Sequence, residues 1–290
     1  MAKPLVSLGI AATAFYAPVV PLAMYLLYRN WWRPPKIAWY PFILLSLMRL
    51  ASGPVLIALA NNIASEGLYI AATFLLNVGV IPLLLVNFGF VLIVITNNIR
   101  DRAQVKRFGK IVRLALSLSI CYLVVGSSLA TVKPNIARIF QLLGYGFFAL
   151  ILLGLLARQV SFLRKNHELI PSSRTVATRA LVAAPFLLVR SVYGLLYYGT
   201  NYYTLDSNGQ YTAHQSLWNP ITGKHVAFAL MGLLSEYISV CIYFYVGFAI
   251  PSNEAFLNSP TRQAQRANAS VFAFSTFSYV QGEQRRGYYE

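Results

Sequence analysis

Seven long apolar stretches follow one another along the chain, and short segments with charged or turn-forming residues separate them. An α-helix rises about 1.5 Å per residue, so about 20 apolar residues cross the roughly 30 Å hydrocarbon core of a bilayer. Each stretch reaches that length. The pattern predicts an all-α membrane protein, a seven-transmembrane-helix bundle in residues 1–250, with spans near 5–28, 37–60, 68–96, 109–132, 137–158, 176–199 and 225–250.

Local residues refine two of these spans. The third stretch is long, and we expect a tilted or kinked helix around Pro82, with Gly79 and Gly89 nearby. The fourth and fifth stretches are joined by only Lys133-Pro134-Asn135-Ile136. A proline at this point ends one helix and permits the next, which predicts a tight antiparallel hairpin.

Composition excludes the main soluble classes. The chain is 57% hydrophobic and 11% charged, whereas a soluble domain carries about 25% charged residues. The net charge of +16 would suggest nucleic acid in a soluble protein. In a membrane protein the basic residues report topology instead, so we expect the lipid bilayer as a partner and no nucleic acid. The expected location is the plasma membrane or another membrane of the secretory pathway.

Basic residues gather in the odd-numbered loops and the C-terminal tail. Seventeen lie there and four lie in the even-numbered loops or before the first span. Lys and Arg in short loops are retained on the cytoplasmic side, which predicts an outside N-terminus and a cytosolic C-terminus. Residues 251–290 lose the apolar pattern, which is typical of a disordered cytosolic tail. The glycosylation sequon at Asn268 would then stay unmodified.

The basic cytosolic loops have two expected partners. They would favour anionic lipid of the inner leaflet, and in a receptor the loop 97–110 would bind a cytosolic protein partner.

Three ionisable residues fall in the middle of predicted spans. At about 1.5 Å per residue, Arg49, Arg190 and Glu236 lie roughly 16, 14 and 17 Å below the outer ends of their helices. A charged side chain at that depth costs about 2.5 to 3.5 kcal/mol, so these residues should face the interior and pair. Arg190 and Glu236 are the favoured pair because their helices are consecutive.

Other polar residues accompany this trio. Asn77 and Asn87 flank Pro82 and should either bond freed backbone carbonyls or line a cavity. Tyr193 and Tyr197 share the Arg190 face, although such tyrosines also form interfacial belts. The predicted buried polar core and candidate ligand site comprises Arg49, Arg190, Glu236, Tyr193, Tyr197, Asn77 and Asn87.

The trio allows two interpretations. It could be a structural salt bridge. Alternatively, two arginines against one glutamate leave a formal charge of +1, and a guanidinium without a carboxylate binds phosphate or carboxylate in bidentate geometry. An anionic small molecule or a lipid headgroup could supply that group.

Catalytic chemistry has little support. The three histidines, His167, His214 and His225, lie in loops or at a helix end, so neither a metal site nor a cofactor is predicted inside the bundle. The chain lacks P-loop, HExxH and GxSxG motifs. Glu236 is the only carboxylate within a span, so no catalytic residue is assigned and an enzyme is disfavoured.

The seven spans resemble those of an uncharacterised family of fungal seven-helix integral membrane proteins, known only as a domain of unknown function. The residues that carry this resemblance are Leu187-Leu188-Val189-Arg190-Ser191-Val192-Tyr193 and Leu234-Ser235-Glu236-Tyr237 through Gly247-Phe248. It covers roughly residues 1–250. The arginine followed by an aromatic residue in the sixth span and the acidic residue in the seventh also resemble, more distantly, those of the fungal RTA-like lipid-translocating exporters. Those exporters carry a glutamate shortly after the arginine, where this chain has Gly194 and Leu195.

Three functions follow from these observations. The first is a non-enzymatic ligand-sensing or lipid-associated membrane protein with a buried Arg/Arg/Glu core. The second is a transporter or lipid translocator whose flux depends on Glu236. The third is a membrane enzyme of fungal secondary metabolism.

Overall fold

Helices make up most of the structure, a computed structural model that describes residues 2–31, 36–62, 65–99, 101–130, 133–164, 171–201, 203–205, 211–213, 216–221 and 223–249. The helices are α1 (Ala2–Tyr16), α2 (Val19–Asn30), the 3-10 turn η1 (Lys36–Ala38), α3 (Tyr40–Asn61), α4 (Glu66–Val78), α5 (Val80–Asn98), α6 (Arg102–Leu129), α7 (Pro134–Arg164), α8 (Pro171–Thr200), α9 (His225–Ala227), the π-helix η3 (Phe228–Leu234) and α10 (Ser235–Ala249).

Seven helical segments of the described chain are long and apolar enough to cross a membrane. They run over Pro4–Asn30, Lys36–Asn61, Gly67–Asn98, Ala103–Leu129, Pro134–Arg164, Ser173–Thr200 and His225–Ala249. The predicted seven-helix bundle is confirmed, and its architecture is that of a multi-pass integral membrane protein. The direction of crossing stays a prediction. The predicted tail, with Asn268, lies outside the described residues.

The segment after α8 departs from helix. Strands β1 (Tyr203–Leu205) and β2 (Tyr211–Ala213) pair antiparallel, with Tyr203 opposite Ala213. Aromatic and β-branched residues favour this pairing. The predicted all-α architecture therefore holds for the bundle, and this short hairpin is an addition to it. The residues between the strands lie outside the described part of the chain.

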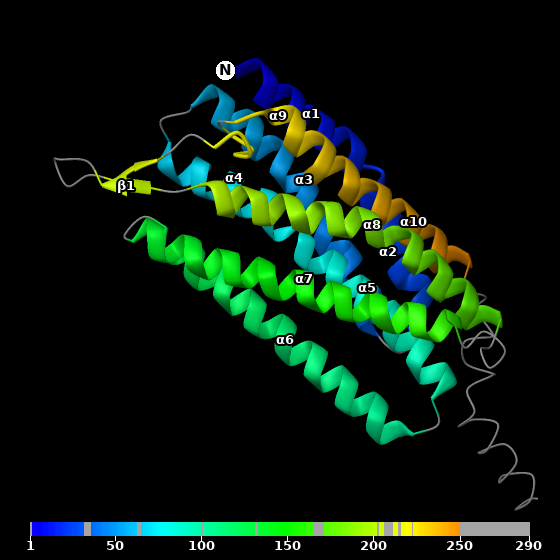
Figure 1. Cartoon of the computed structure of the whole chain (residues 1–290). Helices are drawn as coiled ribbons and strands as arrows, with labels where there is room; N and C mark the ends of the chain where they lie inside the picture. The colour runs from blue at the N-terminus through cyan, green and yellow to red at the C-terminus, as the bar shows by residue number, and fades with distance from the viewer. Residues whose placement is uncertain are drawn as a thin grey trace, which may run out of the picture.

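Helix α5 lies at the centre of the bundle (Figure 1). Every residue from Val80 to Ile95 except Leu85 is buried. A helix that is apolar on all sides suits a central position, because it has no polar face that its neighbours would cover. It contacts α3, α6, α7, α8 and α10.

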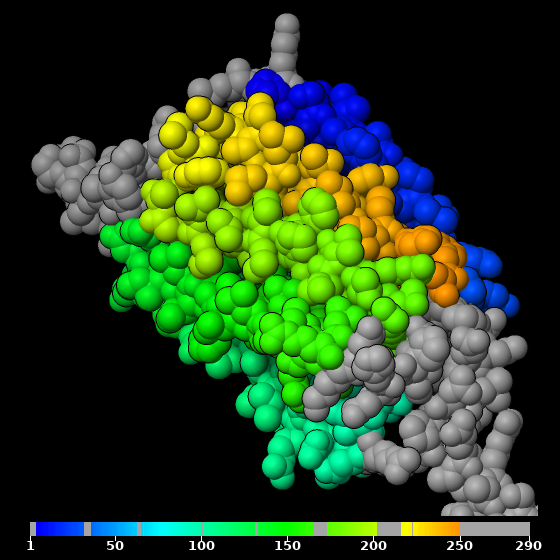
Figure 2. Space-filling view, turned by 45° about the vertical axis from the view of Figure 1, so that its right-hand side comes forward, coloured from blue at the N-terminus to red at the C-terminus, as the bar shows by residue number. Residues whose placement is uncertain are grey.

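The other helices form a layer around α5. Figure 2 shows α10, α8 and α7 side by side on one face, with α1 and α2 beyond α10. Helix α1 packs along α3, where an added Cβ at Gly9 would lie 2.8 Å from the Gly53 carbonyl oxygen. Small residues of this kind let transmembrane helices approach closely.

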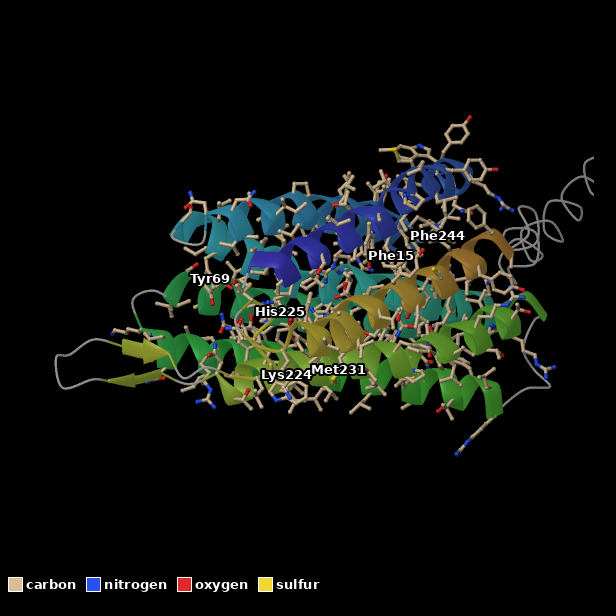
Figure 3. All side chains as sticks on the ribbon, turned by 90° about the horizontal axis from the view of Figure 1, so that it is seen from above. Phe15, Tyr69, Lys224, His225, Met231 and Phe244 are labelled. Atoms are coloured by element: carbon tan, nitrogen blue, oxygen red, sulfur yellow. The ribbon has the colours of Figure 1, made fainter. Side chains whose placement is uncertain are left out.

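The two ends of the bundle differ. The N-terminus, the β1–β2 hairpin and the α6–α7 turn lie at one end, which we call the hairpin end (Figure 1). Figure 3 shows Tyr69 toward this end and Phe244 toward the opposite end. Helices α6 and α7 extend beyond their apolar stretches. At the start of α6 the Asp101 side chain accepts a hydrogen bond from the Ala103 amide at 2.8 Å, so a cap sets this boundary.

The third span is interrupted near its middle, close to the tilt or kink that the sequence predicts around Pro82. The break falls at Gly79, between the end of α4 at Val78 and the start of α5 at Val80. Proline has no amide hydrogen and cannot bond the carbonyl four residues earlier, which weakens the helix at this point. Helix α4 ends at this break, and the carbonyl groups of Leu75, Leu76 and Asn77 accept hydrogen bonds from side chains of other helices.

Candidate functional site

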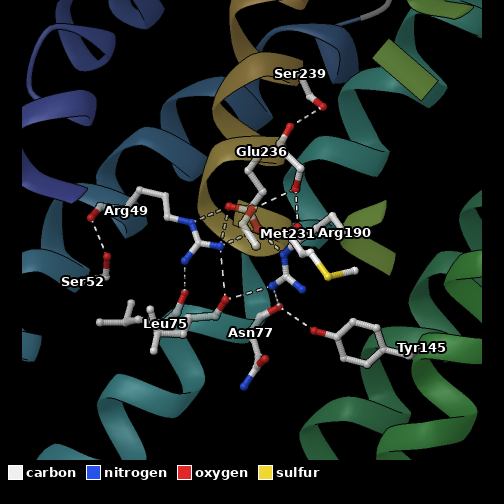
Figure 4. A network of polar contacts seen from close by, with 12 residues as sticks. Arg49, Ser52, Leu75, Asn77, Tyr145, Arg190, Met231, Glu236 and Ser239 are labelled. Atoms are coloured by element: carbon white, nitrogen blue, oxygen red, sulfur yellow. Dashed lines mark hydrogen bonds and ion pairs between the residues drawn. The ribbon is translucent and has the colours of Figure 1, made fainter. Parts of the chain in front are cut away.

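An ion cluster lies at the centre of the bundle, formed by Arg49 of α3, Arg190 of α8 and Glu236 of α10 (Figure 4). All three side chains are 0% exposed. Arg49 donates from Nε to Glu236 Oε2 at 2.7 Å and from Nη2 to Oε1 at 2.5 Å. Arg190 donates from Nε to the same Oε1 at 2.5 Å. One carboxylate therefore serves two guanidinium groups.

Other donors of the cluster bind the C-terminal end of α4. Arg49 donates to the carbonyl oxygens of Leu75 and Leu76, both at 3.1 Å. Arg190 Nη2 donates to the Leu76 carbonyl at 3.0 Å and the Asn77 carbonyl at 3.4 Å. The C-terminal end of a helix carries partial negative charge. This end therefore offsets part of the positive charge that one carboxylate leaves uncompensated.

Gly79 makes this contact sterically feasible. A Cβ added there would lie 2.7 Å from Arg49 Cζ and 2.9 Å from Arg49 Nε. Any side chain at position 79 would displace the guanidinium from the helix break. Gly79 therefore lies at the break between α4 and α5, and its lack of a side chain leaves room for the Arg49 guanidinium.

A π-helical segment precedes the glutamate. Residues Phe228–Leu234 form η3, and Glu236 follows in the first turn of α10. Ser235 donates to the Met231 carbonyl and, at 3.1 Å, to the Gly232 carbonyl. A π-helix shifts the register of the residues that follow it, and such segments are frequent at functional sites.

The arginine–glutamate pairing predicted for Arg190 includes Arg49 as well. Five of the six guanidinium nitrogens donate hydrogen bonds, and only Arg190 Nη1 is buried with no partner among the described residues. A bidentate anion needs two neighbouring donors, so the geometry favours a structural role for this cluster.

The tyrosines and asparagines of the predicted core lie in different places. Tyr193 donates to the Trp218 carbonyl at 2.6 Å, and its ring centre lies 5.8 Å from Arg190 Cζ. Asn77 donates from Nδ2 to the Thr73 carbonyl at 2.9 Å and also lines a cavity. Tyr197 lines the same cavity.

Asn87 belongs to a separate polar pair. Its Oδ1 accepts a hydrogen bond from Gln159 Nε2 of α7 at 2.9 Å. This pair lies on the opposite side of the Gly79 break from Asn77 and takes no part in the ion cluster.

Sequence analysis missed Tyr145 of α7. Its hydroxyl donates to the Asn77 carbonyl at 2.9 Å, the same carbonyl that Arg190 reaches. Its ring packs on Gly194 of α8, where an added Cβ would lie 2.7 Å from Tyr145 Cζ. A tyrosine within an apolar helix has no sequence signal that separates this role from ordinary packing.

The cavity lies at the hairpin end of the bundle, between α4, α6, α7 and α8, and has a volume of about 350 Å³. Apolar wall positions include Ile70, Phe74 and Leu123, while Asn77 and Tyr145 form its deep end. Ile70 and Phe74 are exposed on the surface of the bundle. The cavity therefore reaches the apolar flank of the protein, and its floor adjoins the ion cluster.

Two polar atoms in the cavity wall have no partner among the described residues, namely Asn77 Oδ1 and Thr73 Oγ1. Asn77 is only 4% exposed. Figure 4 shows its side chain pointing away from Glu236, while its carbonyl is bonded by Arg190 and Tyr145. Buried polar groups are normally satisfied, so these unpartnered atoms make the deep end of the cavity its polar end.

Within the described residues, no group of three His, Cys, Asp or Glu side chains could hold a metal ion. The carboxylate of Glu236 is occupied by the two arginines.

Comparison with known proteins identifies a family. A family model described as "Domain of unknown function (DUF7702)" matches residues 6–253. No curated protein and no solved structure matches the chain. The predicted resemblance to an uncharacterised family is confirmed at this level, while the fungal source and the similarity to RTA-like exporters stay predictions.

Proposed function

Because the chain belongs to the DUF7702 family, whose function is unknown, we propose its role from its geometry: a non-enzymatic membrane protein that binds and senses a small lipophilic molecule in the cavity between α4, α6, α7 and α8. The observation that carries this proposal is the position of Asn77. Asn77 lines the cavity, and its carbonyl accepts hydrogen bonds from Arg190 and Tyr145, so one residue joins the cavity to the ion cluster.

The size and lining of the cavity suit such a ligand. Small-molecule sites are typically apolar pockets of about 300 to 1,000 Å³ with a few placed polar groups. This cavity has that composition and lies at the small end of the range. Its wall includes residues on the exposed apolar flank, so a molecule dissolved in the bilayer has a lateral route into it.

The path from the cavity to the ion cluster is short. A ligand that displaces Asn77 or Tyr145 changes the hydrogen bonds at the Asn77 carbonyl, where α4, α7 and α8 meet. The same end of α4 is bonded by Arg49 of α3. A shift of α4 is therefore transmitted to three other helices. In this proposal, sensing is that coupled movement of the helices. A cytosolic protein partner would read that shift.

Glu236 is poorly placed for catalysis. A general acid or base must reach a reacting group by a hydrogen bond. Both oxygens of Glu236 already accept hydrogen bonds from Arg49 or Arg190, and the side chain has no exposed surface. This arrangement supports a binding function over a membrane enzyme.

The test is photolabelling of the purified full chain in phosphatidylcholine nanodiscs with a dodecanol that carries a diazirine on its chain. Labelled peptides are mapped by mass spectrometry. We expect saturable labelling of α4 and α6 near Phe74 and Leu123. Uniform, non-saturable labelling of all lipid-facing helices would overturn the proposal.

Two glycines provide a matched pair of variants. Gly67 lines the cavity and Gly146 does not, and an added Cβ at either position would meet nothing within 4 Å. Gly67→Leu should reduce saturable labelling, whereas Gly146→Leu should leave it intact. Equal labelling of both variants would count against occupancy of the cavity.

A further inference from the structure

Arg138 of α7 is a cation in the wall of this largely apolar cavity. Its Nε donates to the Tyr198 carbonyl at 2.9 Å, and its Nη2 donates to the Gly199 carbonyl. These bonds hold the guanidinium against the C-terminal end of α8, which ends at Thr200. The side chain is therefore positioned rather than free to extend into solvent.

The positive charge of Arg138 has no acidic partner among the described residues. The ion pairs of that part of the chain join only Arg49 and Arg190 to Glu236. Both acceptors of Arg138 are neutral carbonyl groups, and its Nη1 makes no hydrogen bond to a described residue. A half-buried guanidinium in this state is suited to a carboxylate or phosphate oxygen.

Polar groups lie at both ends of the cavity, and the wall between them is mostly apolar. Arg138 and Tyr145 are seven residues apart on α7, or about 10 Å along the helix axis. Phe74 of α4 and Leu123 of α6 form the apolar wall, and Gln141 of α7 lies between Arg138 and Tyr145 in sequence. This order matches a molecule with a charged head near Arg138 and an apolar chain that reaches toward Asn77.

We propose that the occupant of the cavity is an acidic amphiphile, with a carboxylate or phosphate headgroup that accepts hydrogen bonds from Arg138 and a single apolar chain directed toward Tyr145 and Asn77. This inference rests on the proposed function, because it assigns the chemistry of the same cavity. The anion lies at Arg138 and not at the central arginines, where Arg190 Nη1 alone lacks a partner among the described residues and a bidentate anion needs two neighbouring donors.

The experiment compares two diazirine probes of equal chain length, dodecanoic acid and dodecanol, on the full chain in phosphatidylcholine nanodiscs. The wild type should be half-saturated at an acid concentration on the order of tenfold to a hundredfold below that of the alcohol, because a charge-assisted hydrogen bond is added. Arg138→Gln should remove this preference and retain labelling by the alcohol. Arg138→Lys should keep part of it.

Lys133→Gln is the matched control, because it removes one positive charge five residues before Arg138, just ahead of α7, at a residue that does not line the cavity. It should keep the full acid preference. Equal affinity of the wild type for acid and alcohol would overturn the acidic-headgroup inference, and this result does not depend on the folding of any variant. Saturable alcohol labelling that Gly67→Leu reduces would then leave the proposed function standing, whereas loss of saturable labelling by both probes would overturn both.

The source of the headgroup is resolved by adding phosphatidic acid to the nanodiscs. Competition with the dodecanoic acid probe identifies a membrane phospholipid as an occupant. Unchanged labelling identifies a free single-chain acid. Either outcome supports the shared acidic chemistry if the Arg138→Gln variant has lost the preference.

Discussion

Arg49 and Arg190 donate to the same atom, Oε1 of Glu236, from helices on different sides of the central break. Arg49 also donates to Oε2, so it makes two hydrogen bonds to the carboxylate, whereas Arg190 makes one. The two arginines are therefore unequal partners. Their removal should have unequal effects.

Glu236→Gln should destabilise the protein by about 3 to 5 kcal/mol, because it leaves two buried guanidinium groups without a carboxylate. Arg190→Gln should be milder, since Arg49 and Glu236 remain a neutral, doubly bonded pair. Thermal unfolding followed by circular dichroism in detergent measures both. Asp101→Asn makes the same chemical change at an exposed cap and should have little effect.

Combination variants test whether the cluster acts as one unit. The double variant Arg190→Gln with Glu236→Gln still buries Arg49 without a carboxylate, so it should recover only part of the lost stability. Adding Arg49→Gln should recover more, because no net charge then remains buried. Full recovery in the double variant would show that Arg49 does not depend on Glu236.

Gly79→Ala should destabilise the protein by about 1 to 3 kcal/mol, because the new methyl group overlaps the Arg49 guanidinium. Gly146→Ala, in open space on α7, should be neutral or stabilising by up to about 1 kcal/mol. Chemical unfolding of the two variants side by side gives the difference. Equal effects would mean that Arg49 moves away from the break without loss.

Tyr145→Phe should lower the free energy of unfolding by about 0.5 to 1.5 kcal/mol, the usual contribution of one hydrogen bond. The ring and its packing on Gly194 are retained, so the change isolates the bond to the Asn77 carbonyl. In the sensing proposal this variant should also keep saturable labelling of the cavity but lose the ligand-induced change in amide hydrogen exchange at the end of α4. An unchanged hydrogen-exchange response would contradict transmission through Tyr145.

Asn77→Leu and Asn87→Leu should differ although both asparagines belong to the third span. Asn77→Leu removes an unpartnered buried oxygen and one hydrogen bond to the Thr73 carbonyl of the same helix, so it should change stability by less than about 1 kcal/mol. Asn87→Leu leaves Gln159 Nε2 without its partner and should cost about 1 to 3 kcal/mol. Photolabelling should show the reverse order, with the larger loss in Asn77→Leu. A larger stability loss for Asn77→Leu would make its side chain a structural element.

The seven helices could be predicted from sequence alone, because a helix needs about 20 consecutive apolar residues to cross the hydrocarbon core. Such a run is recognised within each segment, without knowledge of the rest of the fold. A tilt or kink in the third span could be predicted in the same way, since Pro82 weakens the helix wherever its neighbours lie. The burial of Arg49, Arg190 and Glu236 followed from the cost of charge at mid-depth.

The contacts of these residues depend on the packing of the helices, and most of them could not be predicted from the sequence. The acceptors at the end of α4 are backbone carbonyls, which every residue carries and no sequence pattern marks. Tyr145 reaches Asn77 because Gly194 allows α7 and α8 to approach, and that contact depends on how the helices pack. The cavity is formed where α4 packs against α6, α7 and α8, so Arg138 became a candidate only when its position in the cavity wall was known. The depth of a residue in the membrane depends on its position along its own helix, whereas its contacts depend on how the helices are arranged.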